Sequence, residues 1–431
     1  MRKKKILVHG TLKSLYNFFA DAVSRDFEII GLLSARPKKI SIMQNGKALA
    51  ALTPKNLPKF NYELIDGIIF TGKDKSVADF FLEQGIEPRK IIFYDAESGW
   101  QARNTKTEDG TKIIYFYGLE FHLRNQADEN TFKRIKNYIQ GQWQVKNWSP
   151  EHYSEVLKEN FQKRRGKSLD FDNLQTFMEK LNWMKVFDAT PLKSRLADKY
   201  AVRSWVAEKI GAEYLIPLLG VWKDFDDINF DDLPDQFVLK CNHGWNMNIV
   251  VRDKKSLDMI GARERINAWL AVDYSATCLE LHYTRIDRKI IAEKFMQNGD
   301  LPDLIDYKFW CFGGKPTYCK CMTGRTTDLR IDYFDMNWQH MHYEQKNRPN
   351  SNHPEEIPPP KNFELMKSLV AKLAEGFPFV RVDFYEIEGR VYFGEMTFTP
   401  AAGNIIYKSE GTDEYLGSLL KLPAPTPPPA L

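Results

Sequence analysis

Two carboxylates near the end of the chain have the spacing of a metal site. Asp383 and Glu395 are twelve residues apart, and each lies in the middle of an apolar stretch. The sequence Glu388-Gly389 between them predicts a tight turn, which would place the two carboxylates opposite each other, roughly 5 Å apart. Carboxylates this close repel each other, and Mg²⁺, which prefers one or two carboxylates plus phosphate oxygens, would relieve the repulsion. Pairing of each acid with a base, such as Arg381 or Arg390, is the alternative.

A lysine and a glutamate at two other strand ends could bind a nucleotide. Lys240 closes an apolar strand and precedes the loop 241–248, whose amides could cover a triphosphate while the ammonium neutralises it. A solvated strand end is the alternative for this lysine. Glu293 ends another apolar run and could receive ribose hydroxyls, and the backbone around Lys294 could meet an adenine edge.

The first hundred residues alternate between strand and helix patterns. Strands are expected at Lys5–Gly10, Phe27–Leu33, Ile65–Phe70 and Lys90–Tyr94, with an amphipathic helix at Leu12–Ser24. This alternation predicts a parallel, Rossmann-like sheet in residues 1–100. Only one of the three glycines of a dinucleotide fingerprint is present, so a scaffold, or a site for a sugar or another protein, is favoured over cofactor binding.

Residues 101–192 are predicted to form a helical connector. Helices are expected at Glu129–Trp148, Tyr153–Arg165 and Phe171–Phe187. Basic residues gather on the first two; they are Lys133, Arg134, Lys136, Lys146, Lys163, Arg164 and Arg165. They could contact an anionic glycan or lipid, and a solvated helix face is the alternative.

Residues 193–423 mix helices with β-hairpins, which makes the chain α/β followed by α+β. A helix is expected at Ala197–Ile210, and hairpins at 306–321 and 379–396. The proline-rich residues 424–431 are expected to be disordered.

Composition limits the classes of partner. Lys and Arg number 61 against 57 Asp and Glu, so bulk charge gives no case for nucleic acid. We find no signal peptide and no apolar run long enough to span a membrane. Five cysteines without a zinc spacing favour reduced thiols and a cytoplasmic protein, with the inner face of the membrane as a further option.

From about Phe171 to Pro423 the sequence resembles an ATP-grasp domain of the TupA-like kind, found in bacterial capsule and teichuronic-acid gene clusters. Six motifs in the family's order and spacing carry the resemblance: Leu196-Ala-Asp-Lys199-Tyr-Ala-Val-Arg203, Phe237-Val-Leu-Lys240-Cys-Asn-His-Gly244, Ile290-Ile-Ala-Glu293-Lys294, Asp306-Tyr-Lys308-Phe, Phe377-Pro-Phe-Val-Arg381-Val-Asp383 and Phe393-Gly-Glu395-Met-Thr-Phe-Thr-Pro400.

The resemblance implies roles for individual residues. ATP would be bound by residues in the nucleotide motifs: Lys199, Lys240, His243, Gly244, Glu293, Lys294 and Lys308. The loop 242–248 would be the lid over the phosphates. Mg²⁺ would be held by Asp383 and Glu395, with Thr397 where ATP-grasp enzymes usually have asparagine. Lys240, Arg381 and Arg325 would serve the chemical step, the two arginines by holding an acyl phosphate; for Arg325 a structural ion pair is an equal alternative.

These parts imply an ATP- and Mg-dependent ligase that joins a carboxylate to an amine through an acylphosphate. The family context suggests a uronic acid of a surface polysaccharide, or its precursor, as the acid, and an amino acid or other amine as the partner. A glycosyltransferase using the N-terminal domain is one alternative. A non-catalytic ATP-binding module is another, because Thr397 offers only a neutral hydroxyl and the lid is poor in glycine.

Overall fold

A computed structural model describes residues 4–10, 27–33, 43–44, 47–48, 51–52, 67–71, 76–83, 86–95, 99–107, 110–117, 119–145, 150–299, 304–324 and 327–429. The chain forms two compact units, one of residues 1–147 and 258–273 and the other of residues 148–257 and 274–431. The predicted helix Leu12–Ser24 and the base Arg325 lie outside the described residues.

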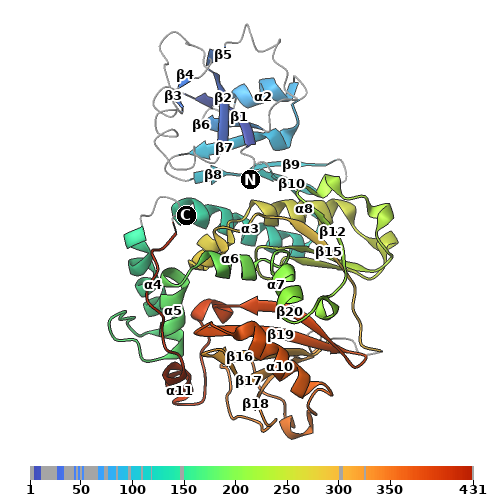
Figure 1. The fold of residues 1–431 in the computed structure, drawn as a ribbon. Helices are drawn as coiled ribbons and strands as arrows, with labels where there is room; N and C mark the ends of the chain where they lie inside the picture. Colours follow the sequence, from blue (N-terminus) through green and yellow to red (C-terminus); the bar gives the residue numbers. More distant parts are fainter. Residues whose placement is uncertain are drawn as a thin grey trace. The chain divides into compact units, whose positions relative to one another are not determined.

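The first unit contains a six-stranded sheet of order β5-β2-β1-β6-β7-β8 (Figure 1). Its strands are β1 (Lys4–Gly10), β2 (Phe27–Leu33), β5 (Ala51–Leu52), β6 (Gly67–Thr71), β7 (Ile91–Asp95) and β8 (Gly99–Gln101). All neighbours are parallel except β8, which is antiparallel to β7. The continuous burial of Gly67–Thr71 is typical of a parallel strand covered on both faces. The predicted parallel sheet is confirmed, and its Rossmann-like character stays a prediction.

Shorter elements complete this part of the unit. They are β3 (Met43–Gln44), which pairs with β4 (Lys47–Ala48), and the helix α2 (Ser76–Glu83) between β6 and β7.

The predicted helical connector is wrong in its first part. Residues 103–123 form a three-stranded antiparallel sheet of β9 (Arg103–Lys106), β10 (Lys112–Phe116) and β11 (Leu119–Leu123). The β-branched and aromatic residues of β10 favour a strand, since such side chains pack well on a pleated surface. Two helices of the same unit, α3 (Gln126–Val145) and α8 (Met259–Ala271), both contact β11 and also contact each other.

The second unit begins with helices whose limits are set by polar caps. After α4 (Pro150–Arg165), the helix α5 (Phe177–Phe187) starts later than predicted. The Thr176 hydroxyl accepts from the Glu179 amide, and the Glu179 carboxylate accepts from the Thr176 amide, which is a capping box.

The predicted helix Ala197–Ile210 is two helices, α6 (Pro191–Ala197) and α7 (Val202–Lys209). Asp198 Oδ1 accepts from the Tyr200 amide at 2.8 Å and the Ala201 amide at 3.2 Å, which turns the chain between them. This turn carries Lys199.

Several of the basic residues predicted to meet an anionic partner are paired with acids. Arg165 contacts Asp413 at 2.6 Å with only 14% of its side chain exposed. Lys163 contacts Glu159 at 3.3 Å, one helical turn away. These pairs favour the solvated or structural alternative over a shared anion-binding face.

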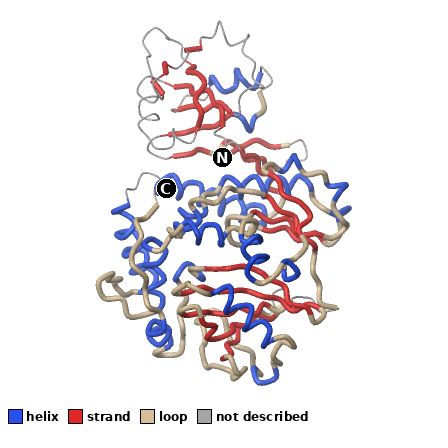
Figure 2. Tube along the Cα trace, in the orientation of Figure 1, coloured by secondary structure: helices blue, strands red, loops and turns tan. Residues whose placement is uncertain are grey.

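Two sheets dominate the second unit, as the strands in Figure 2 show. One has the order β12-β15-β13-β14, with β12 (Leu218–Trp222), β13 (Phe237–Cys241), β14 (Asn248–Val251) and β15 (Ile290–Lys294). The other has the order β18-β17-β16-β19-β20, with β16 (Asp306–Phe312), β17 (Lys315–Thr323), β18 (Arg330–Asp335), β19 (Phe379–Ile387) and β20 (Arg390–Thr397). Both predicted hairpins are confirmed as β16–β17 and β19–β20. Three further helices are α9 (Tyr274–Cys278), α10 (Phe363–Ala374) and α11 (Thr412–Leu419).

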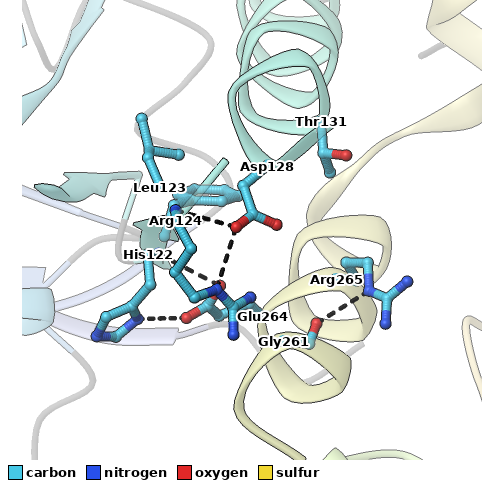
Figure 3. A pocket seen from close by; sticks show the side chains of 9 residues that line it. His122, Leu123, Arg124, Asp128, Thr131, Gly261, Glu264 and Arg265 are labelled. Atoms are coloured by element: carbon cyan, nitrogen blue, oxygen red, sulfur yellow. Dashed lines mark hydrogen bonds and ion pairs between the residues drawn. The ribbon is translucent and has the colours of Figure 1, made fainter. Parts of the chain in front are cut away.

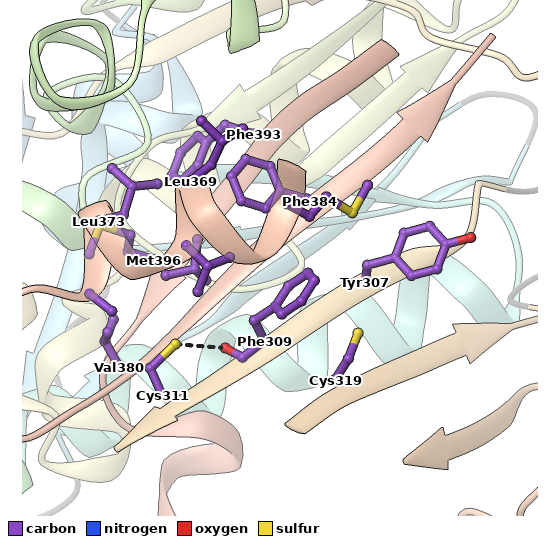
Figure 4. Close-up of a cluster of buried hydrophobic side chains, with 14 of the residues drawn as sticks. Tyr307, Phe309, Cys311, Cys319, Leu369, Leu373, Val380, Phe384, Phe393 and Met396 are labelled. Atoms are coloured by element: carbon purple, nitrogen blue, oxygen red, sulfur yellow. Dashed lines mark hydrogen bonds between the residues drawn. The ribbon is translucent and has the colours of Figure 1, made fainter. Parts of the chain in front are cut away.

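The five-stranded sheet buries one face in the main hydrophobic core. Alternate residues such as Phe309, Cys319, Val380 and Phe393 belong to this core, as Figure 4 shows, and α10 packs on the same sheet. Because successive side chains of a strand point to opposite faces, the residues between them belong to the other face.

Three smaller predictions can be compared with the described part of the chain. All five cysteines are free thiols, as expected. Among the described residues no helix is both long and apolar enough to cross a membrane. In the predicted disordered tail, Thr426 donates from its amide at 2.7 Å and its hydroxyl at 3.0 Å to the Phe187 carbonyl, so this residue is held against the end of α5.

Candidate active site

One row of charged side chains crosses the five-stranded sheet on the face opposite the core. Cross-strand pairing places Lys320 of β17 beside Lys308 of β16, Lys308 beside Asp383 of β19, and Asp383 beside Glu395 of β20. Residues directly opposite on neighbouring strands share a face. The sheet therefore gathers four charged residues from four strands in a single line.

The hairpin that joins β19 and β20 produces the predicted juxtaposition of Asp383 and Glu395. Its turn residues have φ angles of 50° at Glu388 and 74° at Gly389, the left-handed pair that a two-residue hairpin turn requires. The register shifts by one residue next to Asp383, which leaves Gly394 without a partner. A Cβ at Gly394 would lie 3.1 Å from the Tyr385 ring and 3.2 Å from the Asp383 carbonyl. Glycine at this bulge thus helps to hold the two carboxylates opposite each other.

Arg381 bridges the two carboxylates. Its Nε donates to Asp383 Oδ1 at 2.7 Å, and its Nη2 donates to Asp383 Oδ2 at 2.8 Å and to Glu395 Oε1 at 2.5 Å. The Lys308 ammonium also pairs with Asp383, and lies 3.2 Å from Asp306. The sequence left open the alternative that each acid pairs with a base. The structure shows such pairing, although a single arginine pairs with both acids.

The two acids differ in their access to solvent. The Asp383 side chain is 2% exposed, whereas that of Glu395 is 33% exposed. Burial alone would raise the pKa of Glu395, but the charges of Arg381, Lys199 and Lys308 lower it to about 2. Glu395 is therefore ionised at neutral pH. Both of its hydrogen bonds within the described chain use Oε1, the second coming from the Thr397 hydroxyl at 3.0 Å.

The four-stranded sheet brings together two residues that the sequence assigns to different parts of a nucleotide. Lys240 Nζ lies 2.5 Å from Glu293 Oε2, and Arg203 Nη1 lies 3.2 Å from Glu293 Oε1. Glu293 is 7% exposed. Lys294 follows with an exposed side chain, and its amide donates to the Pro217 carbonyl at 2.9 Å. In this structure Glu293 thus serves as the counter-charge of two cations.

Lys199 connects the two sheets electrostatically. Burial lowers the pKa of its ammonium, while the charge of Glu395 on the other sheet raises it and that of Lys240 lowers it further. Lys199 Nζ donates to the Gly244 carbonyl at 2.6 Å. The predicted lysine pair and the predicted carboxylate pair therefore belong to one charged site.

The predicted lid 242–248 is anchored at its beginning. The side-chain amide of Asn242 donates to Asp198 Oδ1 at 2.8 Å and to the Asp287 carbonyl at 3.0 Å. His243 is 2% exposed. A Cβ on Gly244 would lie 2.7 Å from the Met247 sulfur. Trp245, by contrast, is 70% exposed. The exposed residues of the loop are Trp245, Asn246 and Asn248.

A strained turn follows β20 that the sequence does not predict. Ala401 and Ala402 have φ angles of 52° and 50°, a left-handed conformation that residues with a Cβ rarely adopt. The Ala402 carbonyl accepts from the buried Lys185 ammonium at 3.3 Å, and the Gly403 carbonyl from Asn182 at 3.0 Å. Alanine gives no signal of this conformation, so only the flanking Pro400 and Gly403 could have suggested a turn.

Replacing Ala401 by glycine is expected to raise the free energy of unfolding by about 1 kcal/mol, because glycine adopts positive φ without steric cost. Urea denaturation measures the change. The matched control Ala207→Gly, inside α7 at a helical φ, should lower stability by about the same amount. Equal destabilisation by both changes would show that the turn is not strained.

The first unit has a small pocket that contains none of the predicted site residues. It is lined by residues of β11, α3 and α8, such as His122 and Glu264, and by Arg124 between β11 and α3 (Figure 3). His122 pairs with Glu264, and Arg124 lies 2.8 Å from Asp258 and 3.1 Å from Asp128. These ion pairs join β11 and the residues around it to α8, which fits a role in fixing α8 against β11.

Solved structures similar to this chain include a D-alanine–D-alanine ligase from Bacillus anthracis complexed with ATP. It is 12% identical, with a TM-score of 0.30 over 92% of this chain and 87% of that one. An N5-carboxyaminoimidazole synthetase from Staphylococcus aureus complexed with ADP is also 12% identical, with a TM-score of 0.33 over 97% and 78% of the two chains. A comparison with curated proteins finds no match.

A match to a family covers the part of the chain that carries the charged site. The TupA-like ATPgrasp family matches residues 179–421, which is more than half of the sequence and includes both sheets of the second unit. The chain belongs to the TupA-like ATPgrasp family.

Proposed function

We propose that the protein is an ATP- and Mg²⁺-dependent ligase that joins a carboxylate to an amine through an acylphosphate. The observation that carries this proposal is the pairing of Asp383 with Glu395 in one cross-strand register, bridged by Arg381. Membership of an ATP-grasp family supports the choice of nucleotide.

The nucleotide would bind at the cations of the four-stranded sheet. Lys240 comes directly before the loop 241–248, and Lys199 donates to the Gly244 carbonyl within that loop. The charges of both Lys240 and Glu395 act on Lys199. Two ammonium groups next to a loop rich in backbone amides suit a triphosphate. Glu293, which now neutralises Lys240, would exchange that partner for the ribose hydroxyls when the phosphates arrive.

The residues around Glu395 fit a magnesium ion. The Glu395 carboxylate is one-third exposed, and the Thr397 hydroxyl lies 3.0 Å from its Oε1. With Asp383 these are hard oxygen donors of the kind that Mg²⁺ prefers, and Arg381 already places a positive charge between the two acids. Bound magnesium would supply charge neutralisation at the phosphates being transferred.

The chain's own residues account for the remaining work. An oxygen of the substrate carboxylate attacks the γ-phosphorus, and the bond to ADP breaks. The guanidinium of Arg381, released from Glu395, would hold the transferring group, and Lys199 would neutralise the leaving phosphates. The amine then attacks the acyl carbon, phosphate leaves, and the nitrogen loses a proton. Water must be excluded while the acylphosphate exists, a task we assign to the loop around Trp245.

For the substrates, we propose a uronic acid of a surface polysaccharide or its precursor, joined to an amino acid or another amine. Mass spectrometry of mixtures of ATP, Mg²⁺, uronic acids and amino acids tests this directly. The proposal expects an amide product together with ADP and phosphate, and only when acid and amine are both present. Release of a nucleoside diphosphate from a sugar nucleotide, or ATP binding without turnover in every mixture, would contradict it.

A further inference from the structure

Lys320 is the one member of the charged row that has no acidic partner in the described chain. It lies directly beside Lys308 and is 9% exposed. The neighbouring acids are taken by Lys308 and Arg381, and within the described residues the Lys320 ammonium makes no hydrogen bond or ion pair. Its one cation–π contact among the described residues is with the Tyr333 ring, 6.0 Å from the ring centre.

A buried ammonium without a counter-charge is costly, and the surroundings of Lys320 show this. Burial lowers the pKa of Lys320 to about 7, together with the positive charges of Arg381, Lys308 and Arg348, and the charge of Asp383 offsets only part of this lowering. A structural role in an apolar setting would be served better by an uncharged residue of similar volume. The site therefore has a cation available for an anion that enters from outside.

Aromatic side chains form one side of this position. Tyr318, Tyr333 and Tyr343 contact one another with ring centres 5.8 to 6.0 Å apart. Tyr343 is only partly buried and Arg348 is exposed, so this end of the row lies near the surface. A substrate could reach Lys320 from this side.

We propose that Lys320 binds the carboxylate of the acid substrate and positions it for phosphorylation. This inference rests on the proposed function. Two strand spacings separate Lys320 from Asp383, roughly 10 Å in all, and Lys308 lies on the strand between them. A carboxylate held by Lys320 would therefore lie over the same face of the sheet as the proposed metal ligands, close to the γ-phosphate. Lys320 would then select anionic acids and turn their carboxylate towards the nucleotide.

Calorimetric titration with acetate, D-glucuronate and inorganic phosphate tests the proposal without relying on turnover. At least one carboxylate probe should bind the wild-type chain at least tenfold more tightly than Lys320→Met, and Lys320→Arg should retain part of the affinity. The matched control Lys315→Met, exposed at the start of the same strand, should bind as the wild type does. At pH 8, binding to the wild type should take up protons, seen as a dependence of the heat on the buffer, and Lys320→Met should lose this dependence.

Thermal unfolding separates binding from folding. Lys320→Met should keep or raise the wild-type melting temperature, since methionine suits a buried position. Equal affinity of the wild type and Lys320→Met for every probe, including no binding by either, would overturn the inference. If the probes do not distinguish the two proteins but nucleotide binding still depends on Glu395, the proposed function is kept and only the role of Lys320 is lost. If a carboxylate probe binds the wild type more tightly than Lys320→Met but no nucleotide binds, the anion site is kept and the proposed function is lost.

Discussion

Replacing Glu395 by glutamine is expected to lower ATP-dependent phosphate release about 1000-fold, a loss of roughly 4 kcal/mol of transition-state stabilisation. Glu395 is ionised at neutral pH, and the neutral amide of glutamine cannot offer Mg²⁺ a negative ligand. The free energy of unfolding should change by less than about 1 kcal/mol, because the side chain is one-third exposed and Arg381 keeps its two bonds to Asp383.

Phosphate release and urea denaturation, measured on the same preparations, check both parts of this expectation. The matched control is Glu388→Gln, an exposed acid at the turn of the same hairpin that lies outside the charged row. It should keep wild-type turnover. Wild-type turnover in Glu395→Gln would refute its assignment as a metal ligand.

Asp383→Asn should behave differently, although it also removes one negative charge. Asp383 is buried and pairs with both Lys308 and Arg381, so the change leaves two buried cations short of their counter-charge. We expect a loss of about 3–5 kcal/mol in the free energy of unfolding, in addition to the loss of turnover. The two carboxylates are thus equivalent in the sequence but unequal in the fold.

A double variant distinguishes this electrostatic explanation from a general loss of packing. Lys308→Met together with Asp383→Asn removes one cation along with the acid. It should recover part of the stability lost in Asp383→Asn, as measured by urea denaturation, while phosphate release remains absent. If the double variant loses the sum of the two single effects, the pairing of Lys308 with Asp383 contributes nothing measurable.

The sequence predicts the local part of the site well. A short turn at Glu388-Gly389 fixes the register of its own hairpin, so the approach of Asp383 to Glu395 follows from residues close in the chain. The same holds for the hairpin β16–β17. Even the bulge at Gly394 leaves this pairing in place.

The long-range pairing could not be predicted from the sequence. Lys308 meets Asp383 because β16 lies next to β19, two strands that are not consecutive in the chain. Lys240 meets Glu293 for the same reason, across β13 and β15. Such neighbours depend on sheet order, which periodicity does not specify.

Two errors had local causes. The predicted helical connector overlooked β9 to β11 because long amphipathic helices follow them and dominate the pattern of residues 101–192. The prediction of a single helix at Ala197–Ile210 overlooked Asp198. Its carboxylate accepts hydrogen bonds from the backbone amides of the turn between α6 and α7 and so separates the two helices. That break places Lys199 in a turn beside Gly244 rather than on a helix face.

A crystal structure with Mn²⁺ and a non-hydrolysable ATP analogue tests the central claim most directly, because the anomalous signal of manganese locates the ion. The account predicts a manganese ion bound by Asp383 and Glu395 and in contact with phosphate oxygens, with Arg381 turned away from Glu395. An analogue bound elsewhere, with no ion at these acids and Arg381 still joined to both, would contradict it.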